Sequence, residues 1–446
     1  MDFRRAEKAF SARDARELWK ALAALAENQR NTPWTRQLAR YAVSDAAPPP
    51  AVTGPDQLFL DSIVETKRVL QGASPRVLKR RFIGPEMDFL AEKDGIGPWS
   101  IPQCLNYLLL SHIRPHRRSA VVGTMRDDGI YIMEWVAHYL ALGFDHVIIY
   151  TNNNSDGSEE LLRLLAEHGI ITLIEDAASE TVPPDDKANG HAVHLLPELR
   201  DFEWAMFVDS DEYFVPGPQY NQSVVNILDA VQQRFPDKPP SGICYHWLWF
   251  VSGMAYARKP QPLLERFQHA RPHHLTKCIA RIPDLLSMRL NHAPWVKPGG
   301  TLIDSVFDPI DLDASCSDAW WEAVDAWRTP RYGGGRVNHY WARSFEEFAV
   351  KKARGASLKM EQNMFDRPYA SFFQWNGFET PENYYPVDPI LLANVKRKIK
   401  ELETLEGVRS VASKISRNFP RFLKRIHTGA ELRKIYEESM TSPADL

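Results

Sequence analysis

The spacing of apolar residues divides the chain into three stretches. From residue 2 to about residue 43, apolar residues recur with helical spacing, and Leu18, Leu22 and Leu25 share one face. The Pro-rich run AAPPPA at 46–51 cannot lie inside a helix or a central strand, so it reads as a linker. A second helical stretch is expected from Gln57 to about Arg81. The stretch from there to Arg118 is punctuated by Pro and Gly, which predicts irregular structure.

Short β-branched runs alternate with helical patterns after Ser119. The expected strands are SAVVGTM, HVIIYT, IITLIED and AMFVD, and the expected helices are GIYIMEWVAHYLALG, EELLRLLAEHG and a segment around 192–199. Alternation of this kind predicts parallel βαβ units and an α/β fold with helices on both faces of the sheet. Ligands of such sheets bind beyond the carboxyl ends of the strands.

The C-terminal part is helical, with basic and partly amphipathic character in LLANVKRKIKELETLEGV and RIHTGAELRKIYEESM. A solvated helix face is the favoured interpretation, and peripheral contact with a membrane surface is the alternative. The predicted organisation is a helical segment at 1–45, a linker and helical or irregular region at 46–118, an α/β domain at 119–355 and a helical region at 356–446.

Composition narrows the class of protein. The 446 residues are 44% apolar and 25% charged with a net charge of −3, typical of a soluble globular protein without a field that would attract nucleic acid. We find neither a secretory signal nor an apolar run of the roughly 20 residues that span a bilayer. Four separated cysteines predict reduced thiols, and with them a cytoplasmic protein. They are Cys104, Cys244, Cys278 and Cys316.

An acidic cluster ends the fourth expected strand. In WAMFVDSDEYF, the carboxylates Asp209, Asp211 and Glu212 fall within four residues, directly after a buried run. Three like charges need a solvated turn or a cationic partner. Because the cluster lies at the carboxyl end of a strand, we favour a site for Mg²⁺ or Mn²⁺ and a phosphate over a plain turn.

The ordered motifs EWVAHYLALGFDHVIIYTNNNSDGS, FVDSDEYF and NHYWARSFEEFAVKKARG resemble the family 2-type glycosyltransferases over roughly 119–355. The resemblance implies a GT-A fold, a nucleotide-sugar donor, a divalent metal (Mn or Mg) held by the D-x-D pair, and inversion at the anomeric carbon. It leaves the acceptor open between a saccharide, a lipid-linked molecule and a protein.

The resemblance also assigns roles to residues. It implies that Asp209 and Asp211 hold the metal together with His339, and that Asp211 and Glu212 are catalytic. An alternative for Glu212 is that it only braces the loop. Where the family has Lys-Asn-Glu, this chain has Arg126, Asp127 and Asp128. The nucleotide-sugar would be bound by Thr124, Arg126, Asn152, Asp156, Asp209, Lys351 and Arg354.

Several residues keep two interpretations. His292 rivals His339, and His138 is expected to pack its helix against the sheet. Trp247 and Trp249 could stack on a sugar, although alternating Trp in a strand is equally typical of a core. The general base is not identified, and the acidic run TLIDSVFDPIDLD is an exposed insertion or an acceptor loop. The alternative functions are a nucleotidyltransferase with paired carboxylates and Mg²⁺, or a non-catalytic carbohydrate-binding or scaffold protein.

Overall fold

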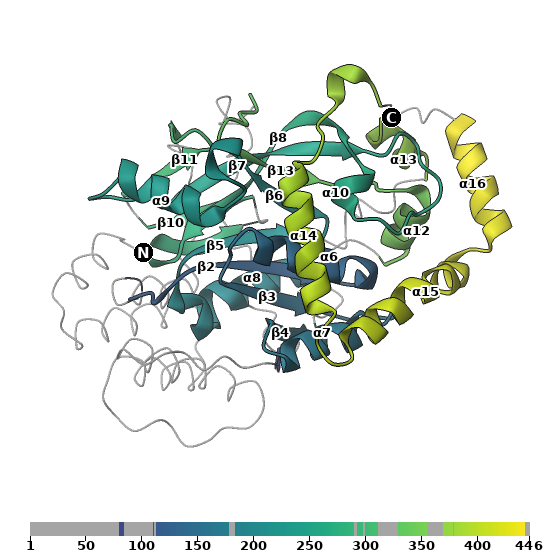
Figure 1. Cartoon of the computed structure of the whole chain (residues 1–446), viewed down its shortest axis with the longest axis horizontal. Coiled ribbons are helices and arrows are strands. Elements are labelled where there is room, and N and C mark those ends of the chain that lie inside the picture. Colours follow the sequence, from purple (N-terminus) through teal and green to yellow (C-terminus); the bar gives the residue numbers. More distant parts are fainter. Residues whose placement is uncertain are drawn as a thin grey trace, which may run out of the picture.

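A computed structural model of the protein describes residues 80–83, 110, 113–177, 183–289, 292–297, 299–310, 329–354, 369–377 and 379–441. The helical segment predicted at 1–45 and the Pro-rich linker lie outside these residues. Figure 1 shows a central sheet with helices on both faces and two C-terminal helices, α15 and α16, at one end of the molecule.

Eleven strands of the described residues form one sheet. The order is β1-β4-β3-β2-β5-β8-β7-β11-β12, and β13 pairs with both β6 and β7. β1 to β5 run parallel to one another, whereas β8 is antiparallel to both β5 and β7. The strands are β1 (Arg80–Ile83), β2 (Arg117–Met125), β3 (His146–Thr151), β4 (Ile171–Asp176), β5 (Phe202–Asp209), β6 (Glu212–Pro216), β7 (Gly242–Val251), β8 (His269–Arg281), β11 (Leu302–Asp304), β12 (Pro309–Ile310) and β13 (Gly335–His339), with β9 (Leu285–Arg289) and β10 (Ala293–Val296) forming a separate pair.

The helices alternate with the parallel strands as the sequence predicted. The α-helices are α6 (Gly129–Ala141), α7 (Ser158–Glu167), α8 (Pro184–Leu195), α9 (Val224–Arg234), α10 (Leu263–Arg266), α12 (Phe345–Arg354), α13 (Ala370–Trp375), α14 (Pro389–Leu402), α15 (Val408–Ile426) and α16 (Gly429–Thr441). The predicted fold class, a mostly parallel α/β sheet flanked by helices, is confirmed.

Two expected boundaries are wrong. The helix expected around 192–199 is α8, which begins at Pro184 and ends at Leu195, and a short 3₁₀ segment starts at Pro197. Proline without an N–H cannot continue the helix there. The segment near Arg81, expected to be the end of a helix, is instead strand β1, which adds to the sheet edge beside β4.

Side chains of the parallel strands alternate between two cores. Val121 of β2 and Ile149 of β3 point to the face covered by α6 and α7, whereas their neighbours Val122 and Ile148 point to the face covered by α8. These runs are apolar throughout because the strands are buried on both faces of the sheet. Together the two layers fix the carboxyl ends of β2, β3 and β5.

The C-terminal helices pack on the α6 face. α14 lies against α6, and α15 contacts α6, α7 and α12. The apolar side of α15 is buried through Val411, Ile415, Phe419 and Leu423. No helix of the described part of the chain is long and apolar enough to cross a membrane.

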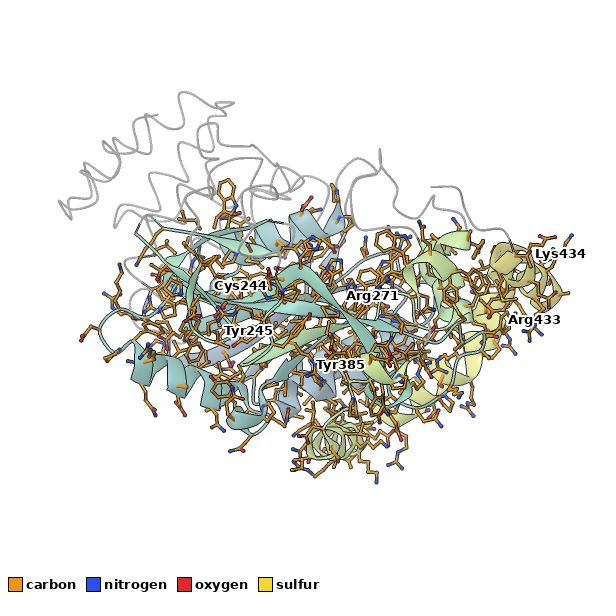
Figure 2. The ribbon with its side chains drawn as sticks, turned by 90° about the horizontal axis from the view of Figure 1, so that it is seen from above. Cys244, Tyr245, Arg271, Tyr385, Arg433 and Lys434 are labelled. Carbon is orange, nitrogen blue, oxygen red and sulfur yellow. A yellow bond between two sulfur atoms is a disulfide. The ribbon has the colours of Figure 1, made fainter. Side chains whose placement is uncertain are left out.

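Two cysteines correct the prediction of reduced thiols. Cys244 and Cys278 form a disulfide between β7 and β8, where they lie opposite each other in the antiparallel register (Figure 2). Their separation of 34 residues hides this proximity in the sequence. The cytoplasmic location that rested partly on reduced thiols remains a prediction.

Candidate functional site

The acidic cluster is the turn between β5 and β6. Asp209 ends β5 at the carboxyl edge of the parallel strands, and its Cα lies opposite Thr124 of β2. Ser210 and Asp211 form the turn, and Glu212 begins β6. The backbone is held from three sides: Trp135 donates to the carbonyl of Asp209, Tyr139 to that of Glu212, and the N–H of Tyr340 to that of Asp211. The carboxylates are therefore mounted on a rigid turn.

Lys277 of β8 neutralises the first half of this cluster. Its Nζ lies 2.9 Å from Asp209 Oδ2 and 3.1 Å from Glu212 Oε2, and the lysine side chain is completely buried. Glu212 Oε2 also accepts the N–H of Asp209 at 2.9 Å. Glu212 is thus buried under the turn and braces it, while the side chain of Asp209 remains about one-third exposed (35%).

Lys351 and His339 approach the second half. Lys351 Nζ of α12 donates to Asp211 Oδ2 at 2.5 Å and to the carbonyl of Trp341 at 3.2 Å. His339 Nε2, at the end of β13, lies 3.6 Å from Asp211 Oδ1. The imidazole packs against Trp247, with ring centroids 4.2 Å apart. Asp211 therefore stands between a cation and an imidazole.

These contacts separate the pKa values of the three acids. Burial raises the pKa of Asp211, but Lys351 and His339 outweigh burial and hold it well below its usual value. The same balance of burial against Lys277 lowers the pKa of Asp209. Burial raises the pKa of Glu212 to about 8, with Lys277 opposing. Asp209 and Asp211 are thus held as carboxylates, each beside a lysine, whereas Glu212 shares Lys277 and has a raised pKa.

A divalent metal can be tested against this donor set. Burial lowers the pKa of His339, so its imidazole is neutral, the form that ligates metals, and its Nδ1 has no hydrogen-bond partner among the described residues. Asp211 Oδ1 and His339 Nε2 together offer two ligands, which suits an ion that takes its other ligands from phosphate and water. No group of three or more potential ligands occurs in the described part of the chain. The metal role predicted for Asp209, Asp211 and His339 remains a prediction.

Two aspartates join the loops that follow β2 and β3. Asp127, in the left-handed region with φ of 50°, accepts the N–H groups of Ser155 and Asp156. Asp156 in turn accepts the N–H of Gly129 at the start of α6 and that of Ser158 at the start of α7. Asp156, predicted to bind the nucleotide, thus ties two helix N-termini together.

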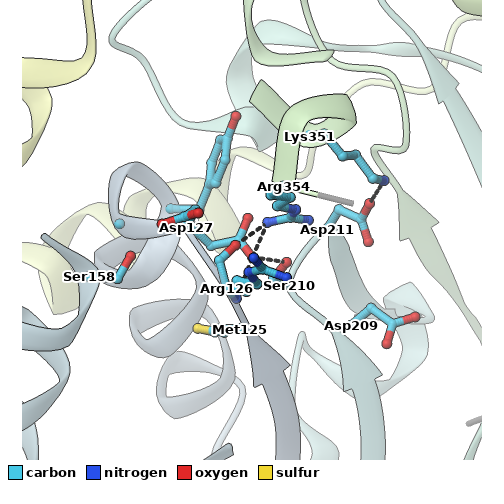
Figure 3. A network of polar contacts seen from close by, with 12 residues as sticks. Met125, Arg126, Asp127, Ser158, Asp209, Ser210, Asp211, Lys351 and Arg354 are labelled. Carbon is cyan, nitrogen blue, oxygen red and sulfur yellow. Dashed lines mark hydrogen bonds and ion pairs between the residues drawn. The ribbon is translucent and has the colours of Figure 1, made fainter. Parts of the chain in front are cut away.

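A second ion-pair network lies beside the turn. Arg354 of α12 binds Asp128 Oδ2 at 2.6 Å and the carbonyl of Arg126 at 2.5 Å, and Ser210 donates to the same Asp128 oxygen at 2.7 Å (Figure 3). Arg343 lies 3.6 Å from Asp128 and stacks over the Tyr131 ring at 3.7 Å. Its φ of 56° is strained for a residue with a side chain, a feature that clusters at functional sites.

A small cavity of about 10 Å³ lies where these elements meet. Its walls combine the polar network with apolar side chains of α15. They include Asp128, Arg343, Lys351, Arg354, Phe419 and Phe422. Helix α15 therefore closes one side of the cavity, next to the cationic residues.

The structure brings most of the predicted site residues to one edge of the sheet. Thr124, Arg126, Asp209, Asp211, Glu212, His339, Lys351 and Arg354 lie there, while Asn152 follows β3 and is half-buried. The rival histidine, His292, also lies near this edge: its ring packs against Trp247, with centroids 5.0 Å apart, and its Nδ1 donates to the carbonyl of Thr276. Asp304 and Asp308 bind Arg331 instead. Asp311 and Asp313 lie outside the described residues.

Three further residues lie at the candidate site although the sequence analysis did not assign them to it: Lys277, Arg343 and Asp128. Lys277 comes from the middle of β8, and no motif marks it. In NHYWARSFEEF, Arg343 stands where the family that the motifs resemble has Lys, and Asp128 stands at the Glu position of Lys-Asn-Glu. The motif comparison could therefore have identified these two. His138, predicted to pack, is buried and forms a hydrogen bond of 2.7 Å with the carbonyl of Phe214.

Part of the chain is similar to known glycosyltransferases. Residues 125–307 match the model of glycosyltransferase family 92, and a search of curated proteins gives no match. Two solved structures of S. aureus TarS align with 72% of this chain. The first is 12% identical with a TM-score of 0.24, and this chain spans about half of its length (55%). The second, TarS 1-349, is 13% identical with a TM-score of 0.24 and is covered over 90% of its length.

The family match covers the strands from β3 to β11 and the whole acidic turn. It supports the predicted enzyme class, a glycosyltransferase, and it names family 92 where the motifs suggested the family 2 type. The similarity to TarS is too low to support any further argument.

Proposed function

We propose that the chain is a glycosyltransferase that moves a sugar from a nucleoside-diphosphate donor to an acceptor hydroxyl, at the turn that holds Asp209 and Asp211. The observation that carries the proposal is the pairing of Asp211 with Lys351 and His339, within reach of Arg343 and Arg354. In an α/β sheet, this edge is where ligands bind.

The donor fits the edge in two parts. The nucleoside would lie over the ends of β2 and β3, near Thr124, Arg126 and Asn152, on loops that Asp127 and Asp156 hold rigid. The diphosphate would meet Lys351 and the guanidinium groups of α12 and its preceding loop. Positive side chains placed before the reaction stabilise charge that grows on the departing phosphate.

The residues act on defined bonds in this scheme. The C1–O bond to the β-phosphate breaks and its electron pair stays on the departing nucleoside diphosphate, while the acceptor oxygen bonds to C1 with inversion and its proton passes to water. Lys351 neutralises the leaving diphosphate, and Glu212 is a positioning residue because it is buried under the turn. Asp211 and His339 would hold Mn²⁺ or Mg²⁺, which when bound supplies Lewis-acid stabilisation of the two phosphates.

Titration calorimetry of UDP and GDP into the full chain, with Mn²⁺ and with EDTA, tests this proposal. We expect one nucleotide to bind in the presence of metal, and Asp211→Asn and Lys351→Gln each to weaken it about 10- to 100-fold, since each removes a charged contact. Lys352→Gln is the matched control, because Lys352 lies over the Tyr369 ring rather than at Asp211.

Thermal unfolding of each variant separates loss of binding from loss of fold. If neither nucleotide binds the folded native chain, with or without metal, the donor site is refuted. If nucleotide binding is unchanged in Asp211→Asn and in EDTA, the metal role of Asp211 is refuted. The phosphate role of Lys351 is refuted if Lys351→Gln binds the nucleotide as the native chain does.

A further inference from the structure

Helix α15 presents an unusual charge pattern. Its 19 residues, VRSVASKISRNFPRFLKRI, contain six Lys or Arg and no Asp or Glu. Because the whole chain has a net charge of −3, the residues outside this helix sum to −9. The helix is therefore a concentrated basic element on an otherwise acidic protein.

The two sides of α15 are separated cleanly. Its apolar side is buried against α6, α7 and α12 through Val411, Ile415 and Phe419. Its basic side chains are exposed: Arg409, Lys414, Arg417, Arg421, Lys424 and Arg425. The apolar side is thus already satisfied by the body of the protein, and only the charged side is available to a partner.

Four of these cations have no acidic partner in the part of the chain that the structure describes. Lys414 pairs with Glu160 and Arg409 lies near Glu403, but Arg417, Arg421, Lys424 and Arg425 make no hydrogen bond or ion pair among the described residues. The neighbouring helices differ. On α14, Lys396 pairs with Glu265 and Lys398 with Glu401, and on α16 Lys434 pairs with Glu438. The basic stripe, Arg417, Arg421, Lys424 and Arg425, is therefore a concentrated set of unpaired cations on one outer helix.

The spacing places these four residues on one line. Positions i, i+4, i+7 and i+8 fall on the same side of a helix, and at 1.5 Å per residue they extend over about 12 Å. Like charges at this spacing repel one another and destabilise an isolated helix. An anionic surface alongside the stripe would reverse that repulsion.

From this pattern, we propose that the basic stripe docks the protein on an anionic membrane surface. α15 lies at the outer edge of the molecule (Figure 1), and cations gathered on one side of such a helix suit a plane of lipid phosphates. Nucleic acid is the less favoured partner, because the described part of α15 exposes no aromatic side chain on which bases could stack. The attachment is electrostatic and without insertion, since the apolar side of the helix is occupied.

The position of the stripe gives the docking a consequence. Phe419 and Phe422 of the same helix line the cavity that also contains Asp128 and Arg354. The candidate active site would therefore be held within about one helix diameter, roughly 10 Å, of the lipid surface. That location favours a lipid-linked molecule among the possible acceptors, a point that rests on the proposed function, whereas the docking itself does not.

Vesicle co-sedimentation of the full chain, without donor or acceptor, tests the docking. We expect binding to phosphatidylcholine vesicles only when anionic phosphatidylglycerol is added, and loss of binding at high salt. The double substitution Arg417→Gln with Arg421→Gln should lower the partition coefficient roughly 25-fold, because each cation near an anionic surface contributes about fivefold. Gln is a good helix former, so the helix should persist, which circular dichroism checks.

The matched control is Arg234→Gln with Lys238→Gln. Both residues are exposed and lie on or next to α9, away from α15 in Figure 1, and the net charge changes by the same amount. The control should bind vesicles as the native chain does. Equal losses in the two double variants would show that net charge alone drives binding and would overturn the stripe. No binding to anionic vesicles, or binding to neutral ones, would overturn the membrane surface as the partner.

Discussion

Replacing the buried Lys277 tests the electrostatic account of the acidic turn. In Lys277→Met the chain keeps a long unbranched side chain but loses the ammonium group that lies 2.9 Å from Asp209 and 3.1 Å from Glu212. Removing one partner of a buried ion pair costs about 3–5 kcal/mol. Asp209 is about one-third exposed (35%), so water can reach its carboxylate, and we expect a loss of about 3 kcal/mol.

A double-mutant cycle isolates the pair. Urea unfolding of the native chain, Lys277→Met, Asp209→Asn and the double variant should give a coupling free energy of about 1–3 kcal/mol, because the double variant leaves no unpaired charge behind. Nucleotide binding should fall in Lys277→Met. In the double variant, binding should recover less than stability does, because Asp209 is also a predicted contact to the donor. A loss below about 1 kcal/mol, or strictly additive losses, would refute the reasoning that Lys277 balances the turn.

Three further outcomes are expected. Burial lowers the pKa of His138 to about 4. The stability that the neutral imidazole contributes is therefore fully present above the unfolded pKa near 6.5 and is lost as pH falls through 4. Urea unfolding should show that acid destabilises His138→Gln by about 3 kcal/mol less than it destabilises the native chain. Gly334→Ala would place a Cβ against the carbonyl oxygen of Ser305 and should lower the unfolding free energy by about 1–3 kcal/mol or more, whereas Gly429→Ala, with open space around it, should not. Alkylation before and after reduction, read by mass spectrometry, should reveal two protected thiols at Cys244 and Cys278, and their labelling without reduction would contradict the disulfide.

The parallel half of the fold could be predicted because its information is local. Each strand from β2 to β5 is an apolar run bounded by polar residues, and α6 and α7 carry their own helical periods and stop at glycine. The antiparallel half could not be predicted in the same way. The antiparallel pairing of β8 with β5 and β7, and of β13 with β6, joins residues tens of positions apart, and the sequence of a single strand does not specify its neighbours.

The same distinction separates the site residues that could be predicted from those that could not. Asp209 and Asp211 are close in sequence and follow a recognisable strand, so the amino-acid sequence alone reveals the cluster. Lys277 reaches it only because β8 lies beside β5, and its 68-residue separation from Asp209 leaves no local trace. The disulfide between Cys244 and Cys278 escapes prediction for the same reason: the antiparallel register of β7 and β8 creates it.

The question raised by three carboxylates in four residues has a physical answer that combines both kinds of information. The local sequence concentrates the acids at a sheet edge, and long-range pairing supplies one lysine for Asp209 and another for Asp211, while burial raises the pKa of Glu212. A turn whose charges were merely solvated would need neither lysine to be buried. Because Lys277 and Lys351 are both buried against it, the turn is preorganised with its carboxylates and cations fixed before any ligand arrives, which is the arrangement that electrostatic catalysis requires.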